Sequence, residues 1–429
     1  MIIAGLLLGA MLAAPTAQGA PSDWSDTLLK DLDAADAAMR GSHPGAVDLR
    51  NPGFVPQLEA ASALARSRAR NVDSFAGYWW AMKGYAASFN DGHVSLNALA
   101  DAPDLPTQWP GFLTGFDGDA QVVMTMDGGP GHPPLGARLL SCDGIDAQTL
   151  AARRVGGFSG RWNLQASRIQ GGGEVLLEQG NPFVPTLRSC DALVDGHEKP
   201  YALQCQPLQA TQRKARLADT RRSFRPANGW HIMPDGGYWI TTSSFNADPT
   251  EQNFKELTAL LEQLAPKAEA LQQARLVVLD VRGNSGGASQ WSIELARLIW
   301  GRAAVDALSD PSWVEWRTSE ANIAQLRGFL QKLVQAPDAS PELRRMLESV
   351  TTGMARARGR GEAVWREPSE ARADTASIGA RPHRCARAGW WSWPMPPAAR
   401  PASMRWICGN GWARCRWAST PRCRCPSAC

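Results

Sequence analysis

The segment from Leu276 to Trp300 constrains the fold of this chain more than any other. Residues 276–281 form an apolar run rich in valine and leucine, which is typical of a buried β-strand. Arg-Gly-Asn-Ser-Gly-Gly follows at 282–287, and its three glycines permit backbone angles that other residues avoid. Apolar residues then return at helical spacing over 289–300. The segment predicts a strand, a glycine-rich turn and a helix, which together direct backbone N–H groups toward an anion or a developing oxyanion.

Length and composition indicate a globular protein. The 429 residues suffice for one large core or two to three ordinary domains. A hydrophobic content of 44% and a charged content of 20% exclude a disordered chain. Nine arginines but no Asp, Glu or Lys follow Asp374, so the net charge of +4 becomes −5 without that segment. The remaining body is mildly acidic, and we expect no nucleic-acid partner.

The N-terminus predicts export. Ile2–Ala14 is an apolar run with the length of a signal-peptide core, too short to cross a bilayer comfortably. Ala17-Gln18-Gly19 supplies small residues at the cleavage positions, so residues 1–19 would be removed and Ala20 would come first. No Lys or Arg precedes the run, and a buried N-terminal helix is the alternative. We expect a periplasmic or extracellular protein without a membrane span after signal removal.

The cysteines indicate one disulfide. Cys190 and Cys205 flank Asp195-Gly196-His197-Glu198, which predicts a turn between two strands that would place both cysteines opposite each other. A disulfide is expected there in an oxidising compartment, and two unpaired buried thiols are the alternative. Cys142 has no evident partner. The other six cysteines lie in the last 45 residues, and their spacing matches no standard zinc pattern, so no metal site is expected.

The chain divides by pattern into four parts after the signal peptide. We expect a helical cap over 20–100, a β-rich module over 101–225, an α/β core over 226–375 and an aberrant tail over 376–429. A turn at 90–96 is expected to lead into a strand. The patterns predict helices over 24–42, 75–89, 254–270, 319–335 and 341–357, and strands over 121–126, 137–140 and 238–242.

Three separated segments resemble one family. They are Asp91-Gly92-His93-Val94, Gly237-Tyr238-Trp239-Ile240 and the run from Leu279 to Gly287. In this order and spacing they resemble the tail-specific, C-terminal-processing and tricorn-core serine peptidases, over roughly residues 24–375. The resemblance implies an α/β fold with a ClpP/crotonase-like core, a helical cap and a PDZ-like β module. It also implies hydrolysis of peptide bonds in peptide or protein substrates by acyl transfer, without a metal or cofactor.

The resemblance also implies roles for particular residues. His93 matches the general base of tricorn-core members, and Gly286 and Gly287 match the loop that supplies an oxyanion N–H. Tail-specific members use a Lys base instead, and the choice between the two bases stays open. For His93 the alternative is a turn histidine that bonds only backbone, and for the glycines a tight connection between strand and helix.

Two other functions are compatible with the same residues. Gly283-Asn284-Ser285-Gly286-Gly287 also resembles the nucleophile loop of trypsin-like HtrA peptidases, in which Ser285 would attack the substrate. Those enzymes build their site on paired β-barrels, whereas this loop follows a hydrophobic strand and precedes a long helix, so we treat Ser285 as a loop residue. A non-catalytic protein that binds a ligand or peptide on the same fold, like the retinoid-binding relatives, is the other alternative.

The nucleophilic serine of the resembling family has no counterpart in frame. In that family it follows the helices, within a strand, a turn of small residues and another helix, and nothing of this kind follows Gly361. The tail carries six tryptophans between residues 390 and 417 and no acidic residue, and it shows no amphipathic period. A chain without this serine is expected to be inactive.

The genetic code offers an explanation for the tail. Trp and Met each have one codon, which fixes much of the DNA. In the frame made from the third base of one codon and the first two bases of the next, Trp390–Trp393 encodes Val-Val and then Leu, Val or Met when Ser392 uses a TCN codon. The junction of Ala399 and Arg400 permits a serine, and Ser403–Ile407 allows Asp-Ala-Leu-Asp-Leu. We hypothesise a frameshift between about residues 372 and 382 that leaves the nucleophile out of frame. A genuine Arg-, Trp- and Cys-rich tail that binds membranes or metal is the alternative.

Overall fold

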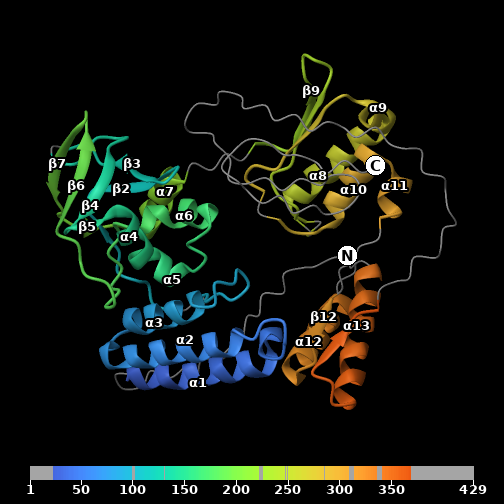
Figure 1. Cartoon of the computed structure of the whole chain (residues 1–429), viewed down its shortest axis with the longest axis horizontal. Coiled ribbons are helices and arrows are strands. Elements are labelled where there is room, and N and C mark those ends of the chain that lie inside the picture. The colour runs from blue at the N-terminus through green and yellow to red at the C-terminus, as the bar shows by residue number, and fades with distance from the viewer. Residues whose placement is uncertain are drawn as a thin grey trace, which may run out of the picture. The chain divides into compact units, whose positions relative to one another are not determined.

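The computed structural model describes residues 23–98, 102–129, 131–221, 226–246, 248, 250–284, 286–308, 314–335 and 341–368. The fold is mixed α/β, as the sequence predicts, and four separate hydrophobic clusters stabilise it (Figure 1). No helix within these residues has the length and apolar character needed to cross a bilayer. The expected signal peptide over 1–19 and the expected aberrant tail over 376–429 lie outside the described residues.

Three helices form the N-terminal part, α1 (Trp24–Ser42), α2 (Phe54–Arg68) and α3 (Phe75–Ala87). Asp23 caps α1, since its Oδ1 accepts hydrogen bonds from the backbone N–H groups of the first turn, and His43-Pro44 ends it. The helices lie side by side in Figure 1 and bury Leu28, Leu32 and Leu58 completely. The strand expected after Asn90 is wrong, because residues 91–98 form a turn and an irregular segment without strand pairing.

An antiparallel sheet forms the second part. Its strands run in the order β2-β3-β4-β6-β7, and β5 pairs with β4. The strands of this part are β1 (Gln108–Trp109), β2 (Phe112–Asp117), β3 (Ala120–Met126), β4 (Arg138–Cys142), β5 (Ile145–Asp146), β6 (Ser189–Val194), β7 (His197–Ala202) and β8 (Gln206–Pro207). The helices are α4 (Ala147–Ala151), α5 (Gly157–Ser159), α6 (Gln165–Gly171) and α7 (Ala210–Thr220). Helical turns at Ala152–Gly156 and Gly172–Glu174 complete it.

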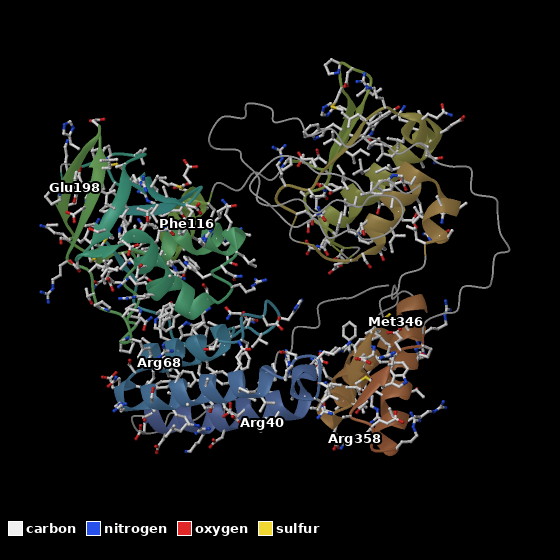
Figure 2. All side chains as sticks on the ribbon, in the orientation of Figure 1. Arg40, Arg68, Phe116, Glu198, Met346 and Arg358 are labelled. Atoms are coloured by element: carbon white, nitrogen blue, oxygen red, sulfur yellow. A yellow bond between two sulfur atoms is a disulfide. The ribbon has the colours of Figure 1, made fainter. Side chains whose placement is uncertain are left out.

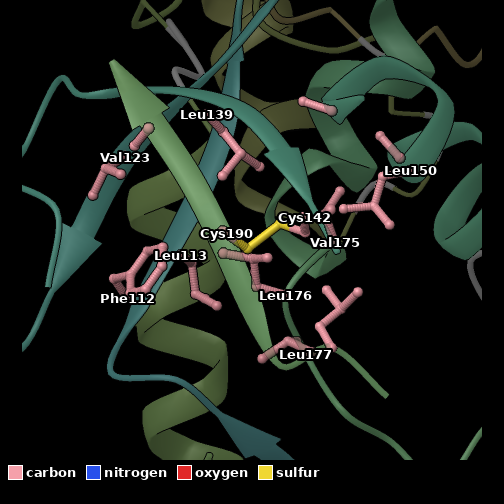
Figure 3. Packing of buried hydrophobic residues seen from close by; sticks show 14 of the residues in the cluster. Phe112, Leu113, Val123, Leu139, Cys142, Leu150, Val175, Leu176, Leu177 and Cys190 are labelled. Atoms are coloured by element: carbon pink, nitrogen blue, oxygen red, sulfur yellow. A yellow bond between two sulfur atoms is a disulfide. The ribbon is translucent and has the colours of Figure 1, made fainter. Parts of the chain in front are cut away.

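The predicted disulfide between Cys190 and Cys205 is wrong. The two-residue turn at Asp195-Gly196 places Cys190 opposite Tyr201, and Cys205 follows the end of β7. Across the other edge of β6, Cys190 lies directly opposite Cys142 of β4, and these two are disulfide-bonded within the buried core (Figure 3). Cys205 is a free thiol, and burial raises its pKa. The register of the hairpin decides the outcome, because it places Tyr201 and not Cys205 opposite Cys190.

A three-stranded sheet with covering helices forms the third part. Strand β10 (Tyr238–Thr241) lies in the middle, antiparallel to β9 (Gly229–Ile232) and parallel to β11 (Val277–Asp280). The helices are α8 (Gln252–Leu264), α9 (Ala268–Gln273), α10 (Gln290–Trp300) and α11 (Arg302–Asp306). Strand, glycine turn and helix follow one another over residues 277–300, as the sequence predicts.

Strand β11 is less buried than its sequence predicts. Val277, Val278 and Leu279 are only partly buried, and the flanking Leu276 and Val281 are 43% and 41% exposed. Within the described residues β11 has a neighbouring strand on one side only, because it is an edge of its sheet. A run of this composition is typical of a strand with neighbours on both sides.

The last part is a helical pair with a small hairpin. Helices α12 (Glu320–Gln335) and α13 (Pro341–Gly359) pack around Leu326, Leu347 and Val350. Strands β12 (Glu315–Arg317) and β13 (Val364–Arg366) pair antiparallel beside them. Figure 2 shows Met346 and Arg358 near the two ends of α13. The expected α/β core over 226–375 therefore contains two separate hydrophobic clusters.

Candidate active site

The glycine loop starts from a carboxylate that the end of β11 holds in place. The Asp280 carboxylate accepts hydrogen bonds from Arg282 Nε at 2.8 Å and Nη2 at 2.6 Å, and only 4% of this aspartate side chain is exposed. Burial by itself would raise the pKa of Asp280, but the hydrogen bonds and charge of Arg282 outweigh it and hold the pKa below its usual value. The pair fixes the direction in which the chain leaves the sheet.

Gly287 lies against the backbone of Phe245. The Phe245 N–H donates to the carbonyl of Gly286 at 3.0 Å, and the Ala288 N–H donates to the carbonyl of Phe245 at 2.7 Å. Gly287 has φ = 132°, and a Cβ there would lie 1.9 Å from the Phe245 carbonyl oxygen. Only glycine fits this close approach without displacement of the neighbouring backbone.

The two candidate oxyanion amides differ in their hydrogen bonds. The Gly286 N–H donates to Asn284 Oδ1 at 2.8 Å. The Gly287 N–H has no acceptor among the described residues, because the bridge to Phe245 uses the groups on either side of it. Asn284 is held in turn by Thr242, with Nδ2 3.4 Å from both the carbonyl oxygen and Oγ1. Gly287 is therefore the amide available to receive a ligand oxygen.

Ser285 lies outside the described residues, so the structure says nothing about its side chain. Its neighbours hold the loop at Phe245 and Thr242. Phe245 lies shortly after the family-like segment Gly237–Ile240. The sequence alone does not indicate that Phe245 contacts Gly287. The pairing depends on the register between that segment and the loop.

His93 lies beside a carboxylate at an exposed turn. Its side chain is 74% exposed, and its Nδ1 is 3.5 Å from Asp91 Oδ1, which also accepts the His93 backbone N–H at 2.8 Å. The other Asp91 oxygen lies 4.0 Å from His43 Nε2. A carboxylate on Nδ1 would leave Nε2 as the nitrogen that exchanges a proton with a substrate or nucleophile. Asp91 begins the same motif, and the sequence alone does not indicate that its carboxylate lies beside the His93 ring.

The neighbours of His93 and of the glycine loop belong to different hydrophobic clusters: Val94 packs against the cluster of the N-terminal helices, and Ala288 lies in the cluster of the three-stranded sheet. Among the described residues no hydrogen bond or ion pair connects His93 with the loop. In the part of the chain that the structure describes, no three His, Cys, Asp or Glu side chains converge in a way that could hold a metal ion. The roles assigned to His93, Gly286 and Gly287 stay predictions.

Neither a protein-family model nor a curated protein matches the chain in sequence. Among solved structures it is similar to mature CPAF complexed with lactacystin, with 12% identity, a TM-score of 0.49, and coverage of 81% of this chain and 75% of that one. It is also similar to mature CPAF, with 11% identity, a TM-score of 0.46, and coverage of 80% and 74%. CPAF is a tail-specific protease of Chlamydia. Similarity at this level leaves the activity of this chain to be argued from its own residues.

Proposed function

We propose that this chain derives from an exported serine-type peptidase of the tail-specific or tricorn-core kind. The observation that carries the proposal is the Gly287 amide, which a close contact with Phe245 holds at the end of a parallel strand. An N–H group fixed before the reaction begins is what stabilises the oxyanion of acyl transfer. In the intact enzyme a serine would attack the peptide carbonyl, and the oxyanion would bind to this amide.

His93 is the proposed general base, with Asp91 as its positioning group. The imidazole would take the proton from the serine hydroxyl during attack and give it to the leaving amine. Water would then hydrolyse the acyl-enzyme and regenerate the serine. Asp91 would orient the imidazole during these steps, through the contact on Nδ1.

We further propose that a frameshift has removed the nucleophile from the 429-residue chain, which would then be inactive. Strand β11 supports this proposal, because a Val-Val-Leu edge strand has half-exposed faces and one neighbouring strand in the described structure. The Val-Val run encoded in the shifted frame at Trp390–Trp393 is a suitable second neighbour. Resequencing the DNA for residues 372–382 tests the frame directly, and an uninterrupted frame with these codons would refute it.

A chain with the frame restored tests the proposed activity. It should hydrolyse an unstructured protein substrate such as casein, and His93→Ala should lower kcat/KM by about 10²–10⁴-fold. His197→Ala is the matched control, because His197 lies at an exposed hairpin turn and should leave the activity unchanged. Tight peptide binding without hydrolysis would favour the non-catalytic alternative. Activity that persists in His93→Ala would exclude His93 as the base.

A further inference from the structure

A small pocket lies between α3 and the segment from Arg154 to Val184, and none of its lining residues is assigned to the proposed peptidase site. The Trp80 Nε1–H donates to the carbonyl of Gln179 at 3.0 Å and ties α3 to this segment. Arg68 of α2, labelled in Figure 2, adds to the contact by stacking over Phe158 at 5.1 Å. The pocket has a volume of about 50 Å³, which is room for a few waters or one polar head group.

Two donors that line the pocket, Arg154 and Ser159, are already used within the protein, whereas the Lys83 ammonium, which also lines it, makes no hydrogen bond or ion pair with a described residue. Arg154 is 7% exposed, and its guanidinium donates to Val175 O at 2.9 Å, to Leu177 O at 3.2 Å, to Pro185 O, and to Glu178 Oε1 at 2.9 Å. The Ser159 hydroxyl donates to the Val155 carbonyl at 3.0 Å. These groups leave little donor capacity for a ligand.

The strongest acceptor in the pocket is unused. The Glu174 side chain is half-buried, and its carboxylate makes no hydrogen bond or ion pair with any described residue, although it lines the pocket together with Arg154 and Ser159. Burial raises its pKa, and the charges of Lys83, Arg221 and Arg213 offset only part of that effect. The Lys83 ammonium also lies 5.9 Å from the centre of the Trp79 ring, so its charge is shared between that ring and Glu174.

The walls favour a cation over a neutral ligand. Trp80 and Phe158 line the pocket, and their rings pack edge to face with centroids 5.3 Å apart. Aromatic walls exclude water, which strengthens a charge pair formed inside, and their faces attract cations. A carboxylate without a hydrogen-bond donor in such a place costs free energy until a donor binds it.

We propose that this pocket binds the head of a small organic cation, an ammonium or guanidinium group, with the Glu174 carboxylate as its main ligand. Both a basic side chain of a peptide and a free amine carry such a head group. A site of this kind would select ligands without taking part in peptide hydrolysis. The proposal does not rest on the proposed function, because none of its residues belongs to the candidate active site.

Calorimetric titration of the full chain at pH 7 with butylammonium chloride tests the proposal. Butylammonium should bind and sodium butyrate should not. Glu174→Gln should weaken butylammonium binding about tenfold or more, because a hydrogen bond to a charged group is lost. Glu198→Gln is the matched control, since Glu198 is exposed on β7, and it should change the affinity less than about twofold. A blocked lysine amide that binds as well as butylammonium would indicate a peptide ligand, and binding of the free amine only would indicate a metabolite.

Thermal unfolding separates binding from a purely structural role. Because the folded pKa of Glu174 is raised, ionisation of this group destabilises the folded chain above that pKa and has no such effect below the unfolded pKa. Glu174→Gln should therefore raise Tm at pH 7 while it weakens butylammonium binding, and it should have little effect on Tm near pH 4. Absence of butylammonium binding to the unmodified chain, or equal binding to Glu174→Gln, would overturn the proposal.

Discussion

At the scale of the residue, Gly287 is the position that the surrounding backbone constrains most. Its φ of 132° and its approach to the Phe245 carbonyl both require glycine, whereas a Cβ at Gly286 would meet no atom within 4 Å. Gly287→Ala should therefore lower the free energy of unfolding by about 2–4 kcal/mol, and Gly286→Ala by about 1–2 kcal/mol for its positive φ alone. Urea denaturation of both variants measures the difference. Equal losses would show that the contact with Phe245 does not constrain the loop.

Asp280 makes the stability of the fold around the loop depend on pH. Its pKa is lower in the folded chain than in the unfolded chain, so the pair with Arg282 stabilises the fold above the unfolded pKa of about 3.9 and loses this effect as the pH falls through the folded value. Asp280→Asn should lower the free energy of unfolding by about 1.5–3 kcal/mol at pH 7. In denaturant unfolding, the difference in free energy between the two chains should vanish at pH values below the folded pKa of Asp280. A difference that stays constant with pH would contradict the ion-pair account.

At the scale of the element, the disulfide joins two neighbouring strands. Peptide mapping without reduction should recover Cys142 linked to Cys190, and iodoacetamide should alkylate Cys205. The linked residues are 48 positions apart, so replacing both by alanine should cost about 4 kcal/mol through the entropy of the unfolded chain. Cys205→Ala is the control and should cost much less. A linkage between Cys190 and Cys205 would restore the original prediction.

Strand β11 carries the second prediction at this scale. If the out-of-frame segment supplies its missing neighbour, hydrogen exchange at Val277–Asp280 should slow by at least tenfold when the frame is restored. Exchange in β6 is the internal control, because β6 already has neighbours on both sides and should not change. Unchanged exchange in β11 would mean that the restored segment pairs elsewhere.

The elements differed in how far the sequence could predict them. Helix α1 was predicted because Trp24 starts an amphipathic period and His43-Pro44 stops it, and β11 and α10 were predicted because their period changes across the glycines. The pairing of Cys142 with Cys190 was missed because it depends on the register between strands 47 or more residues apart, which local patterns do not encode.

At the scale of the whole molecule, the candidate site was predicted as residue types and not as contacts. Gly286 and Gly287 were equivalent in the sequence, and only the structure shows that Asn284 takes the amide of Gly286. Likewise, the motif contained Asp91, but its place beside His93 Nδ1 comes from the turn geometry. No sequence motif indicates the Glu174 pocket, because its lining residues come from two distant segments, residues 80–83 and 154–184.

The central claim is that the attacking serine is encoded out of frame and that Ser285 is not the nucleophile. A fluorophosphonate probe followed by mass spectrometry tests this claim most directly, since the probe forms a covalent bond with an activated serine. The account predicts no labelling of the 429-residue chain and labelling of the frame-restored chain at a serine beyond residue 382. Labelling of the 429-residue chain that Ser285→Ala abolishes would contradict it.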